Sequence, residues 1–301
     1  MRIIAALRRH GPVGFIRRAI PYAKSQVAVR YHRQRLQNEP AYESPTEEEF
    51  ARIEEHLLEI GVQVNDYAPK IEGFTEFKRA NWFPPTYHGG VDGGVWDEKL
   101  LEHWISYERL ELESFRPTDI YVDIAAASSP WARELRNRHQ FEAFANDLGP
   151  VGHDFSHLPY YRSEDATSSA FSSGSVRGAS LHCAYEMFIG HSDTNLIDEL
   201  ARILKPGGRA LIVPLYMHTH YCAYSTPEFY GKGYSDIDAK EYVRFDASNI
   251  PSSRKYDPES LKNRVLHRIE ECGMDYRLLA LRNKADLGKN VYCHFILEIN
   301  K

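Results

Sequence analysis

Acidic residues follow three successive apolar segments in the middle of the chain. Asp123 closes the β-rich segment 119–123, Asp147 stands 24 residues further on, and Asp165 follows a third short segment. An acid at the end of a second parallel strand can accept hydrogen bonds from both hydroxyls of a ribose, and Asp147 has the position for it. Asp165 is placed to accept a hydrogen bond from an adenine amino group. This spacing therefore predicts a nucleoside-binding edge of a sheet.

The residues that follow Asp123 are small. Ala125-Ala-Ala127-Ser-Ser129 precedes Pro130, and proline is favoured in the first turn of a helix, so we expect a helix over 130–140. Strand, tight turn and helix in this order open a nucleotide-binding α/β sheet. Small side chains let the backbone approach a ligand, and the free N–H groups of the helix N-terminus face it.

Two groups that can accept a proton follow the fourth apolar segment. His182 ends that segment and Glu186 lies four residues later. Histidine titrates near neutral pH, so His182 is the preferred general base, and Glu186 is the alternative base or a partner that orients a histidine. The pattern His218-x-His220-x-Cys222 puts three potential ligands on one strand face, but no fourth is evident, and no metal site is expected.

Strands and helices are expected to alternate around these residues. Thr46 and Glu49 form a capping-box pattern at the start of a helix that Gly61 ends, and residues 62–95, rich in Pro, Gly and aromatics, are expected to form a structured loop. Leu204-Lys-Pro-Gly-Gly208 is expected to terminate a helix. The further helices are expected over 96–113, from Asp193 to Leu204, and over 258–272, and the strands over 119–123, 141–145, 176–182, 209–216, 276–281 and 291–299, with a short one ending near 163.

Five landmarks in this order resemble class I S-adenosylmethionine-dependent methyltransferases, particularly methyltransferase-domain proteins linked to surface-polysaccharide pathways. They are Val122-Asp123-Ile-Ala125, Asp147, Asp165-Ala166-Thr167, His182–Phe188 and Leu204-Lys-Pro-Gly-Gly208. The resemblance covers residues 96–216 well and 217–301 loosely. It implies an α/β fold: a mostly parallel Rossmann-like sheet with an antiparallel closing hairpin and a helical N-terminal extension.

The resemblance also implies S-adenosyl-L-methionine as cofactor and gives the residues roles. Asp123 and the turn from Ala125 to Ala127 would border the methionine moiety, Asp147 would hold the ribose, and Asp165 with Ala166 would flank the adenine. His182 and Glu186 would face the methyl-transfer site. The family turn is usually rich in glycine, whereas alanine, which disfavours positive φ, stands here.

Charge is distributed unevenly along the chain. The first 35 residues hold eight Arg, one Lys and no acid, so the remaining 266 residues sum to −14 within the net charge of −5. The arm 1–35 is a candidate for peripheral contact with an anionic membrane, although a solvated arm, a helix packed on the body of the protein or an organellar transit peptide has similar composition. Four widely spaced cysteines fit a reducing, cytoplasmic setting. The acidic body argues against a nucleic-acid substrate.

The expected organisation has three parts: a basic arm and linker (1–45), a helical accessory region (46–115) and a methyltransferase-like domain (116–301) with an insertion at 217–257. The function expected first is O-methylation of a sugar, glycolipid or other small metabolite. The alternative is a catalytically inactive methyltransferase-like scaffold or partner protein, which the alanine-substituted turn motivates.

Overall fold

The computed structural model describes residues 31–149, 155 and 157–301. These residues form two compact units. The larger unit contains Ser44–Tyr221 and Arg254–Lys301, and the smaller contains residues 31–43 and Cys222–Ser253. The part of the basic arm that lies at 1–30 falls outside the described residues. Among the described residues, none belongs to a helix with the length and apolar character needed to cross a membrane.

The larger unit is built on an eight-stranded sheet with the order β1-β10-β11-β6-β5-β2-β3-β4. β11 runs antiparallel to both of its neighbours, and the other pairs are parallel. The strands are β1 (Val64–Tyr67), β2 (Ile120–Ile124), β3 (Glu142–Asp147), β4 (Tyr161–Ser163), β5 (Val176–His182), β6 (Leu204–Leu215), β10 (Asp275–Leu281) and β11 (Phe295–Asn300). This order and the reversed β11 confirm the predicted Rossmann-like class I methyltransferase sheet.

The strand order reverses beside β2. The chain passes from β2 to β3 and β4 on one side and then returns to β5 and β6 on the other side. The carboxyl ends of the parallel strands therefore leave a crevice at β2, which is where open α/β sheets bind their ligands. The register places Ile124 opposite Asn146 of β3 and Leu181 of β5, so the ends of these three strands lie level with one another.

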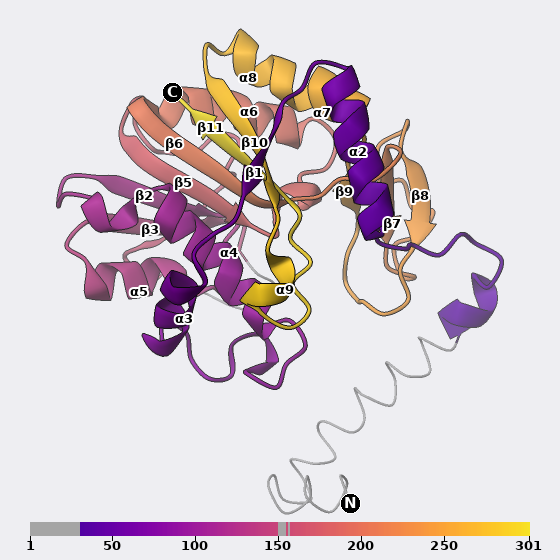
Figure 1. Ribbon diagram of the computed structural model, residues 1–301, viewed down its shortest axis with the longest axis horizontal. Helices are drawn as coiled ribbons and strands as arrows, with labels where there is room; N and C mark the ends of the chain where they lie inside the picture. The colour runs from indigo at the N-terminus through magenta and orange to yellow at the C-terminus, as the bar shows by residue number, and fades with distance from the viewer. Residues whose placement is uncertain (1–30, 150–154, 156) are drawn as a thin grey trace, which may run out of the picture. The chain divides into compact units, whose positions relative to one another are not determined.

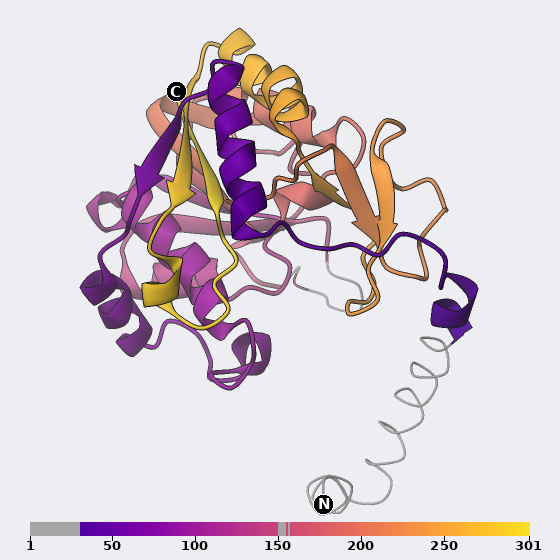
Figure 2. The same cartoon turned by 45° about the vertical axis from the view of Figure 1, so that its right-hand side comes forward.

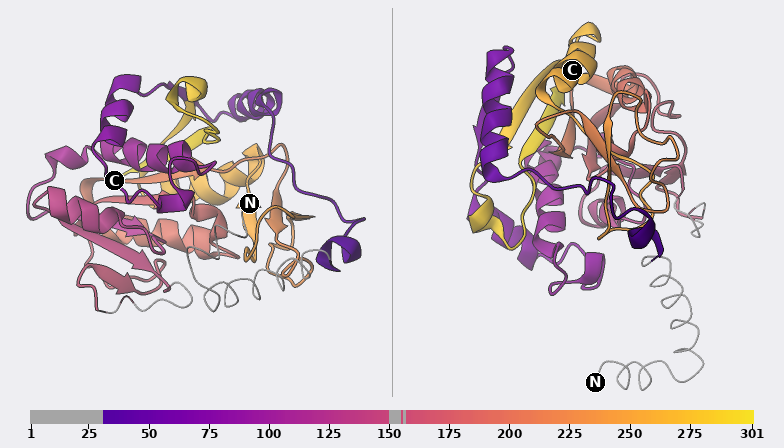
Figure 3. Two further views of the ribbon diagram at one scale, coloured as in Figure 1. Left: turned by 90° about the horizontal axis from the view of Figure 1, so that it is seen from below. Right: turned by 90° about the vertical axis from the view of Figure 1, so that its right-hand side faces the viewer.

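Helices cover both faces of the sheet (Figures 1 and 3). On one face, α2 (Glu47–Glu59), α6 (Ser192–Ile203), α7 (Pro258–Leu261), η4 (Lys262–Leu266) and α8 (His267–Glu271) pack on Val122, Leu181 and Ile212. On the other face, α3 (Ile71–Arg79), α4 (Trp96–Arg109) and α5 (Trp131–Arg138) pack on Tyr121 and Val213. Alternate strand residues thus fill two separate cores. The remaining short helices are η1 (Tyr87–Gly89), η2 (Leu112–Ser114), η3 (Tyr185–Met187) and α9 (Lys284–Leu287).

The prediction of a loop over 62–95 is wrong, because the segment contains β1 and α3. Figure 2 shows β1 beside β10 at the edge of the sheet. In α3, Phe74 and Phe77 form a buried helical stripe, but Gly73 interrupts the helical pattern of the sequence. A Cβ at Gly73 would lie 2.8 Å from the Trp104 ring, so the glycine permits α3 to pack closely on α4.

The helix expected to end at Leu204–Gly208 does end there, but the segment also forms part of a strand. α6 ends at Ile203, and the segment belongs to the first part of β6, where the register against β5 shifts between Val176 and Gly178. A Cβ at Gly208 would lie 2.8 Å from the Lys205 carbonyl oxygen and 3.0 Å from that of Val176. Close backbone approach therefore requires glycine at position 208.

A buried acid ties the amino-terminal ends of three neighbouring strands. Asp119 precedes β2 and accepts hydrogen bonds from Arg177 of β5 at 2.7 Å and from Lys205 of β6 at 2.5 Å. Burial alone would raise the pKa of Asp119, but the hydrogen bonds from Lys205, the backbone N–H of Arg116 and Arg177 hold that pKa well below its usual value. Arg177 thus has a structural partner in Asp119.

The smaller unit contains part of the predicted insertion 217–257. Its β7 (Cys222–Ser225) and β8 (Lys240–Val243) pair in parallel, and Ala41 forms a bridge with Val243. The Tyr42 ring packs on the Tyr224 ring with centroids 4.6 Å apart. β9 (Ser253–Lys255) lies where the chain passes back to the larger unit. Residues 31–43, expected as part of the arm and linker, therefore belong to this unit.

Candidate functional site

A cavity of about 510 Å³ lies at the carboxyl ends of β2, β3 and β5. Its size is within the range of small-molecule sites. Five of the six predicted cofactor-binding residues line it: Ala125, Ala127, Asp147, Asp165 and Ala166. The other lining residues are Asn146, Leu148, Thr167, Cys183, Ala184, Met187, Phe188, Ile189 and Ser192.

The turn after β2 keeps a left-handed backbone at both alanines that replace glycine. Ala125 has φ 54° and Ala127 has φ 47°. Each L-residue in this region costs about 1–2 kcal/mol relative to the right-handed form, so the surrounding structure must impose the conformation. Alanine has therefore not relaxed the turn into another shape.

Three hydrogen bonds impose this turn. Ala127 N donates to Asp147 Oδ2 at 2.9 Å, and Ala126 N donates to the Asn146 carbonyl oxygen at 3.0 Å. The Tyr161 hydroxyl donates to the Ala127 carbonyl oxygen at 2.8 Å. The residues that hold the turn all come from β3 and β4, so the end of one strand fixes the backbone after another.

Two neighbouring residues of β3 present oxygen atoms at the cavity. Asp147 Oδ1 accepts from Gly149 N at 2.9 Å while its Oδ2 binds the turn, yet each carboxylate oxygen can accept a further hydrogen bond. Asn146 is buried, and its Oδ1 has no partner among the described residues although its Nδ2 donates to the Glu164 carbonyl oxygen. A buried amide oxygen left without a donor indicates that a ligand or a water supplies one.

Other residues that line the cavity are apolar. Leu148 is 79% exposed and Met187 is 37% exposed, and Phe188 and Ile189 continue this wall. Asp165 Oδ1 accepts from both the N–H and the hydroxyl of Thr167 at 2.8 Å, which fixes the loop beside Ala166. Exposed apolar side chains beside oriented acids suit a flat ring that carries polar groups at its edge.

Asp123 and His182 do not line the cavity. His182 Nδ1 is 3.0 Å from Asp123 Oδ1, and Nε2 is 2.9 Å from the Ser106 hydroxyl and 3.2 Å from the Ser180 hydroxyl. The order Ser106–His182–Asp123 matches the contacts of a hydrolytic triad. Ser106 has no exposed surface, however, so no substrate reaches its hydroxyl. These contacts join α4 to the ends of β2 and β5.

Cys183 connects the cavity to Glu186. It has φ 52°, lines the cavity, and places its Sγ 3.2 Å from the Tyr216 hydroxyl and 3.5 Å from Glu186 Oε1. Burial raises the pKa of the Cys183 thiol to about 12, so the thiol stays protonated. Glu186 itself is buried, and its Oε2 has no partner among the described residues. Sequence reasoning missed Cys183, Asn146 and Tyr216.

α4 buries charged residues as well as apolar ones. Its apolar residues Leu100 and Leu101 are buried, but Glu98, Lys99, Glu102 and His103 are buried too. Glu98 Oε2 accepts from the backbone N–H groups of Tyr292 and Cys293, and Glu102 Oε1 accepts from Lys99 Nζ at 2.7 Å. A charged helix face normally predicts solvent exposure, so the sequence pattern gave no sign of this burial.

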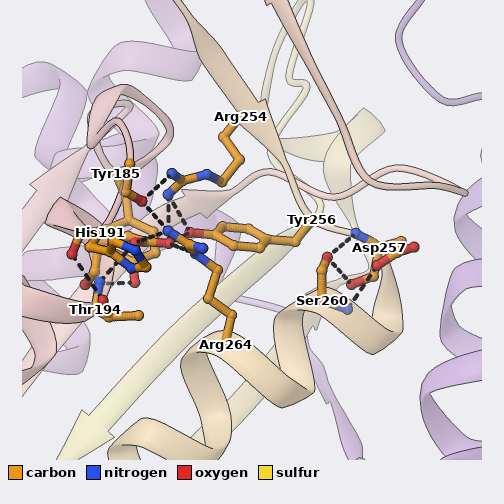
Figure 4. A network of polar contacts seen from close by, with 10 residues as sticks. Tyr185, His191, Thr194, Arg254, Tyr256, Asp257, Ser260 and Arg264 are labelled. Atoms are coloured by element: carbon orange, nitrogen blue, oxygen red, sulfur yellow. Dashed lines mark hydrogen bonds and ion pairs between the residues drawn. The ribbon is translucent and has the colours of Figure 1, made fainter. Parts of the chain in front are cut away.

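A second buried network fixes the wall that contains Ile189 and Ser192. Arg254 and Arg264 both bind Asp193 Oδ2, at 2.5 and 2.6 Å, and the Tyr256 hydroxyl donates to the same oxygen at 2.6 Å. Both arginines also donate to the Gly190 carbonyl oxygen. Figure 4 shows Arg254, Tyr256 and Arg264 converging on this point. The start of α6 is thus held to the segment 254–264.

The histidines of the pattern 218–222 fall in the larger unit, where the ring centroids of His218 and His220 lie 4.4 Å apart. Cys222 begins β7 of the smaller unit.

Neither a family model nor a curated protein sequence matches the chain. Among solved structures, it is similar to 1,6-didemethyltoxoflavin-N1-methyltransferase of Burkholderia thailandensis, with 12% identity, a TM-score of 0.43, and coverage of 80% of this chain and 94% of that one. It is similar to an S-adenosylmethionine-dependent methyltransferase of Mesorhizobium loti, with 12% identity, a TM-score of 0.43, and coverage of 66% and 98%. It is also similar to geranyl diphosphate C-methyltransferase of Streptomyces coelicolor, with 13% identity, a TM-score of 0.38, and coverage of 77% and 98%. The fold assignment rests on the strand order and the direction of β11.

Glycine at the left-handed positions should relieve the strain of the turn. We expect Ala127→Gly to raise the free energy of unfolding by up to about 1 kcal/mol, because glycine adopts positive φ without penalty. Ala126 lies in the same turn but does not have a positive φ, so Ala126→Gly should lower the free energy of unfolding by about 1 kcal/mol. Chemical denaturation of both variants measures the difference, and equal effects would show that the turn is not strained.

Removing the carboxylate between the two arginines should destabilise the larger unit. Asp193→Asn leaves Arg254 buried without its counter-charge, and we expect a loss of about 3–5 kcal/mol in the free energy of unfolding. The matched control is Asp198→Asn, since the pair of Asp198 with Arg268 is far more exposed and should contribute less than about 1 kcal/mol. Urea denaturation measures both, and a loss no larger than that of the control would contradict the role of Asp193.

Burial raises the pKa of Glu98 to about 7, although hydrogen bonds from the backbone of Cys293 and Tyr292 and the charge of Lys99 oppose the shift. The folded protein then holds a proton that the unfolded chain has lost between pH 4.5 and 7, so this group makes stability fall as pH rises through that range. Glu98→Gln removes the titrating group, so the free energy of unfolding should decrease less over this pH range, by a difference of about 3 kcal/mol at most. Thermal unfolding from pH 5 to 8 measures this difference, and Glu55→Gln, at an exposed position, is the control. If stability depends on pH in the same way in the unaltered protein and in both variants, Glu98 does not titrate as proposed.

Proposed function

We propose that the chain is an S-adenosyl-L-methionine-dependent methyltransferase that methylates a hydroxyl of a sugar, glycolipid or other small metabolite. The observation that carries the proposal is the strained turn Ala125–Ala127, held by Asp147 beside a cavity at the point where the strand order reverses. Strain imposed at such a point is typical of a binding site.

The residues present fit this cofactor. The unpartnered Asn146 Oδ1 and the Asp147 carboxylate offer acceptors for ribose hydroxyls, and the apolar wall at Leu148 and Met187 offers a surface for adenine. Asp165 with Ala166 would flank the adenine edge. The turn Ala125–Ala127 would border the methionine moiety, whereas Asp123, expected beside it, is buried and bonded to His182.

When bound, the cofactor supplies an electrophilic methyl group on a sulfonium. The chain's own residues have little covalent chemistry to do and act mainly by positioning. Cys183 lines the cavity next to Glu186, and its protonated thiol is too weak a nucleophile to compete for the methyl group. Glu186 Oε2 is the group that would take the proton of an acceptor hydroxyl. His182, predicted as the base, has both ring nitrogens engaged and instead positions Asp123 and Ser106.

The alternative is an inactive methyltransferase-like protein that serves as a scaffold or partner. The retained left-handed turn and the acids at the cavity favour the active enzyme, since a site without a ligand has no need of imposed strain. A cytoplasmic location and peripheral contact of residues 1–35 with an anionic membrane are parts of the proposal that rest on composition and charge.

Calorimetric titration with S-adenosylhomocysteine tests the proposal. We expect micromolar binding that Asp147→Ala abolishes. Because Asp147 also holds the turn, Leu148→Asp is the sharper variant: its side chain is exposed, so the fold should persist, while the new charge should weaken binding at least about tenfold. Asp286→Ala, an exposed acid outside the site, should bind normally. Absence of binding to the unaltered protein would favour the inactive scaffold.

A further inference from the structure

Tyr161 links the edge of the sheet to the turn that borders the cavity. It begins β4, the strand at one edge of the eight-stranded sheet, and only 9% of the residue is exposed. Its sheet partner is Ala145 of β3, and β3 in turn pairs with β2. The Tyr161 hydroxyl nevertheless donates to the Ala127 carbonyl oxygen at 2.8 Å. One side chain therefore joins the edge strand to a turn that follows the strand two places away.

The surroundings of Tyr161 keep its hydroxyl a donor. Burial raises the pKa of Tyr161 well above its usual value, and the charges of Asp147 and Asp123 raise it further. The phenol therefore stays protonated at neutral pH, as its contact with a carbonyl oxygen requires. The Tyr161 ring also packs on the Phe155 ring, with centroids 4.7 Å apart. Ring packing and a hydrogen bond thus fix the side chain together.

Residue 127 passes the effect of Tyr161 to the cavity. Its carbonyl oxygen accepts from Tyr161, while its N–H donates to Asp147 Oδ2 at 2.9 Å. These two peptide groups meet at the Cα of Ala127, so holding one of them restricts the orientation of the other. Ala127 and Asp147 both line the cavity, whereas Tyr161 is not among the described residues that do so. Tyr161 can therefore influence a ligand there only through residue 127.

An alanine at position 127 makes this second hydrogen bond necessary. The φ of Ala127 is 47°, a conformation that glycine adopts freely but that is disfavoured for alanine by about tenfold in population. Without Tyr161, the turn would be held on the side of β3 alone and would leave this conformation more often. A ligand that needs the left-handed turn would then bind more weakly, in proportion to the population that is lost.

Building on the proposed function, we propose that Tyr161 is a positioning residue of the cofactor site, which acts through Ala127 to keep the turn left-handed and the Asp147 carboxylate oriented toward the ribose. The hydroxyl supplies by a hydrogen bond what a glycine would supply by conformational freedom. Tyr161 touches neither the cofactor nor the reacting atoms. Its effect therefore lies in the affinity for the cofactor, and the size of that effect depends on which residue occupies position 127.

Calorimetric titration with S-adenosylhomocysteine tests this dependence in Tyr161→Phe, in Ala127→Gly and in the double variant. We expect Tyr161→Phe alone to weaken binding about fivefold, because the ring is kept and one hydrogen bond is lost. In the Ala127→Gly background the same substitution should weaken binding less than about twofold, since glycine keeps the positive φ without the hydroxyl. A merely structural role of Tyr161 would lower stability in both backgrounds and leave the affinity unchanged.

The matched control is a tyrosine that makes a similar hydrogen bond away from the cavity. Tyr67 ends β1, at the opposite edge of the sheet, and its partly buried hydroxyl donates to Glu108 Oε2 at 2.6 Å. Tyr67→Phe should change the affinity for S-adenosylhomocysteine by less than about twofold. A loss in this control as large as that in Tyr161→Phe would contradict the special role of Tyr161.

A second measurement needs no ligand and separates this inference from the proposed function. Amide hydrogen exchange at Ala127, followed by NMR in protein with isotope-labelled alanine, should be about fivefold faster in Tyr161→Phe and unchanged in Tyr67→Phe. Faster exchange in a protein that binds no S-adenosylhomocysteine would uphold the hold on the turn and refute the cofactor. Unchanged exchange, unchanged affinity in Tyr161→Phe, or an equal loss of affinity in both backgrounds would overturn the inference.

The folding of the variants is informative too. If Tyr161→Phe folds only together with Ala127→Gly, that rescue supports the dependence on residue 127. If neither the single nor the double variant folds, Tyr161 is a structural residue and the positioning role is overturned.

Discussion

The hydrogen bond from Ala127 N to Asp147 Oδ2 is the constraint on which the site depends. It joins the turn after β2 to the end of β3, and it stabilises the left-handed backbone conformation, which is unfavourable for alanine. The same carboxylate lines the cavity, so one side chain both shapes the turn and faces the ligand. The strand order makes this possible, because β2 and β3 are parallel neighbours whose carboxyl ends lie level.

Two groups of buried charged residues lie elsewhere in the larger unit. Asp193, with Arg254 and Arg264, fixes the wall at the start of α6, while α4 brings Glu98 and Glu102 under the sheet ends. Burying such groups is unfavourable unless they are paired, and Glu98 and Glu102 are each bonded through one oxygen only among the described residues. The Asp193 network therefore supports the wall of the cavity.

The sheet and most of the cavity could be predicted from the sequence, since strand periodicity and an acid after each strand are local patterns. Five of the six expected cofactor residues line the cavity for that reason. The edge strand β1 is short and half exposed, and Gly73 interrupts the helical pattern of α3, so neither element was predicted. Glu102 of α4 and Glu186 after β5 both lie near Cys183, and no residue spacing in the sequence predicts that proximity. His182 was predicted from its place after a strand, but which way its ring turns depends on Ser106, far away in the sequence.

The most direct test of the central claim is a crystal structure of the protein grown with S-adenosylhomocysteine. The account predicts adenine against Leu148 and Met187, ribose hydroxyls on Asp147 and Asn146, and the turn unchanged, with positive φ at Ala125 and Ala127. A ligand bound elsewhere, or a turn that abandons the left-handed conformation when the cavity fills, would contradict it.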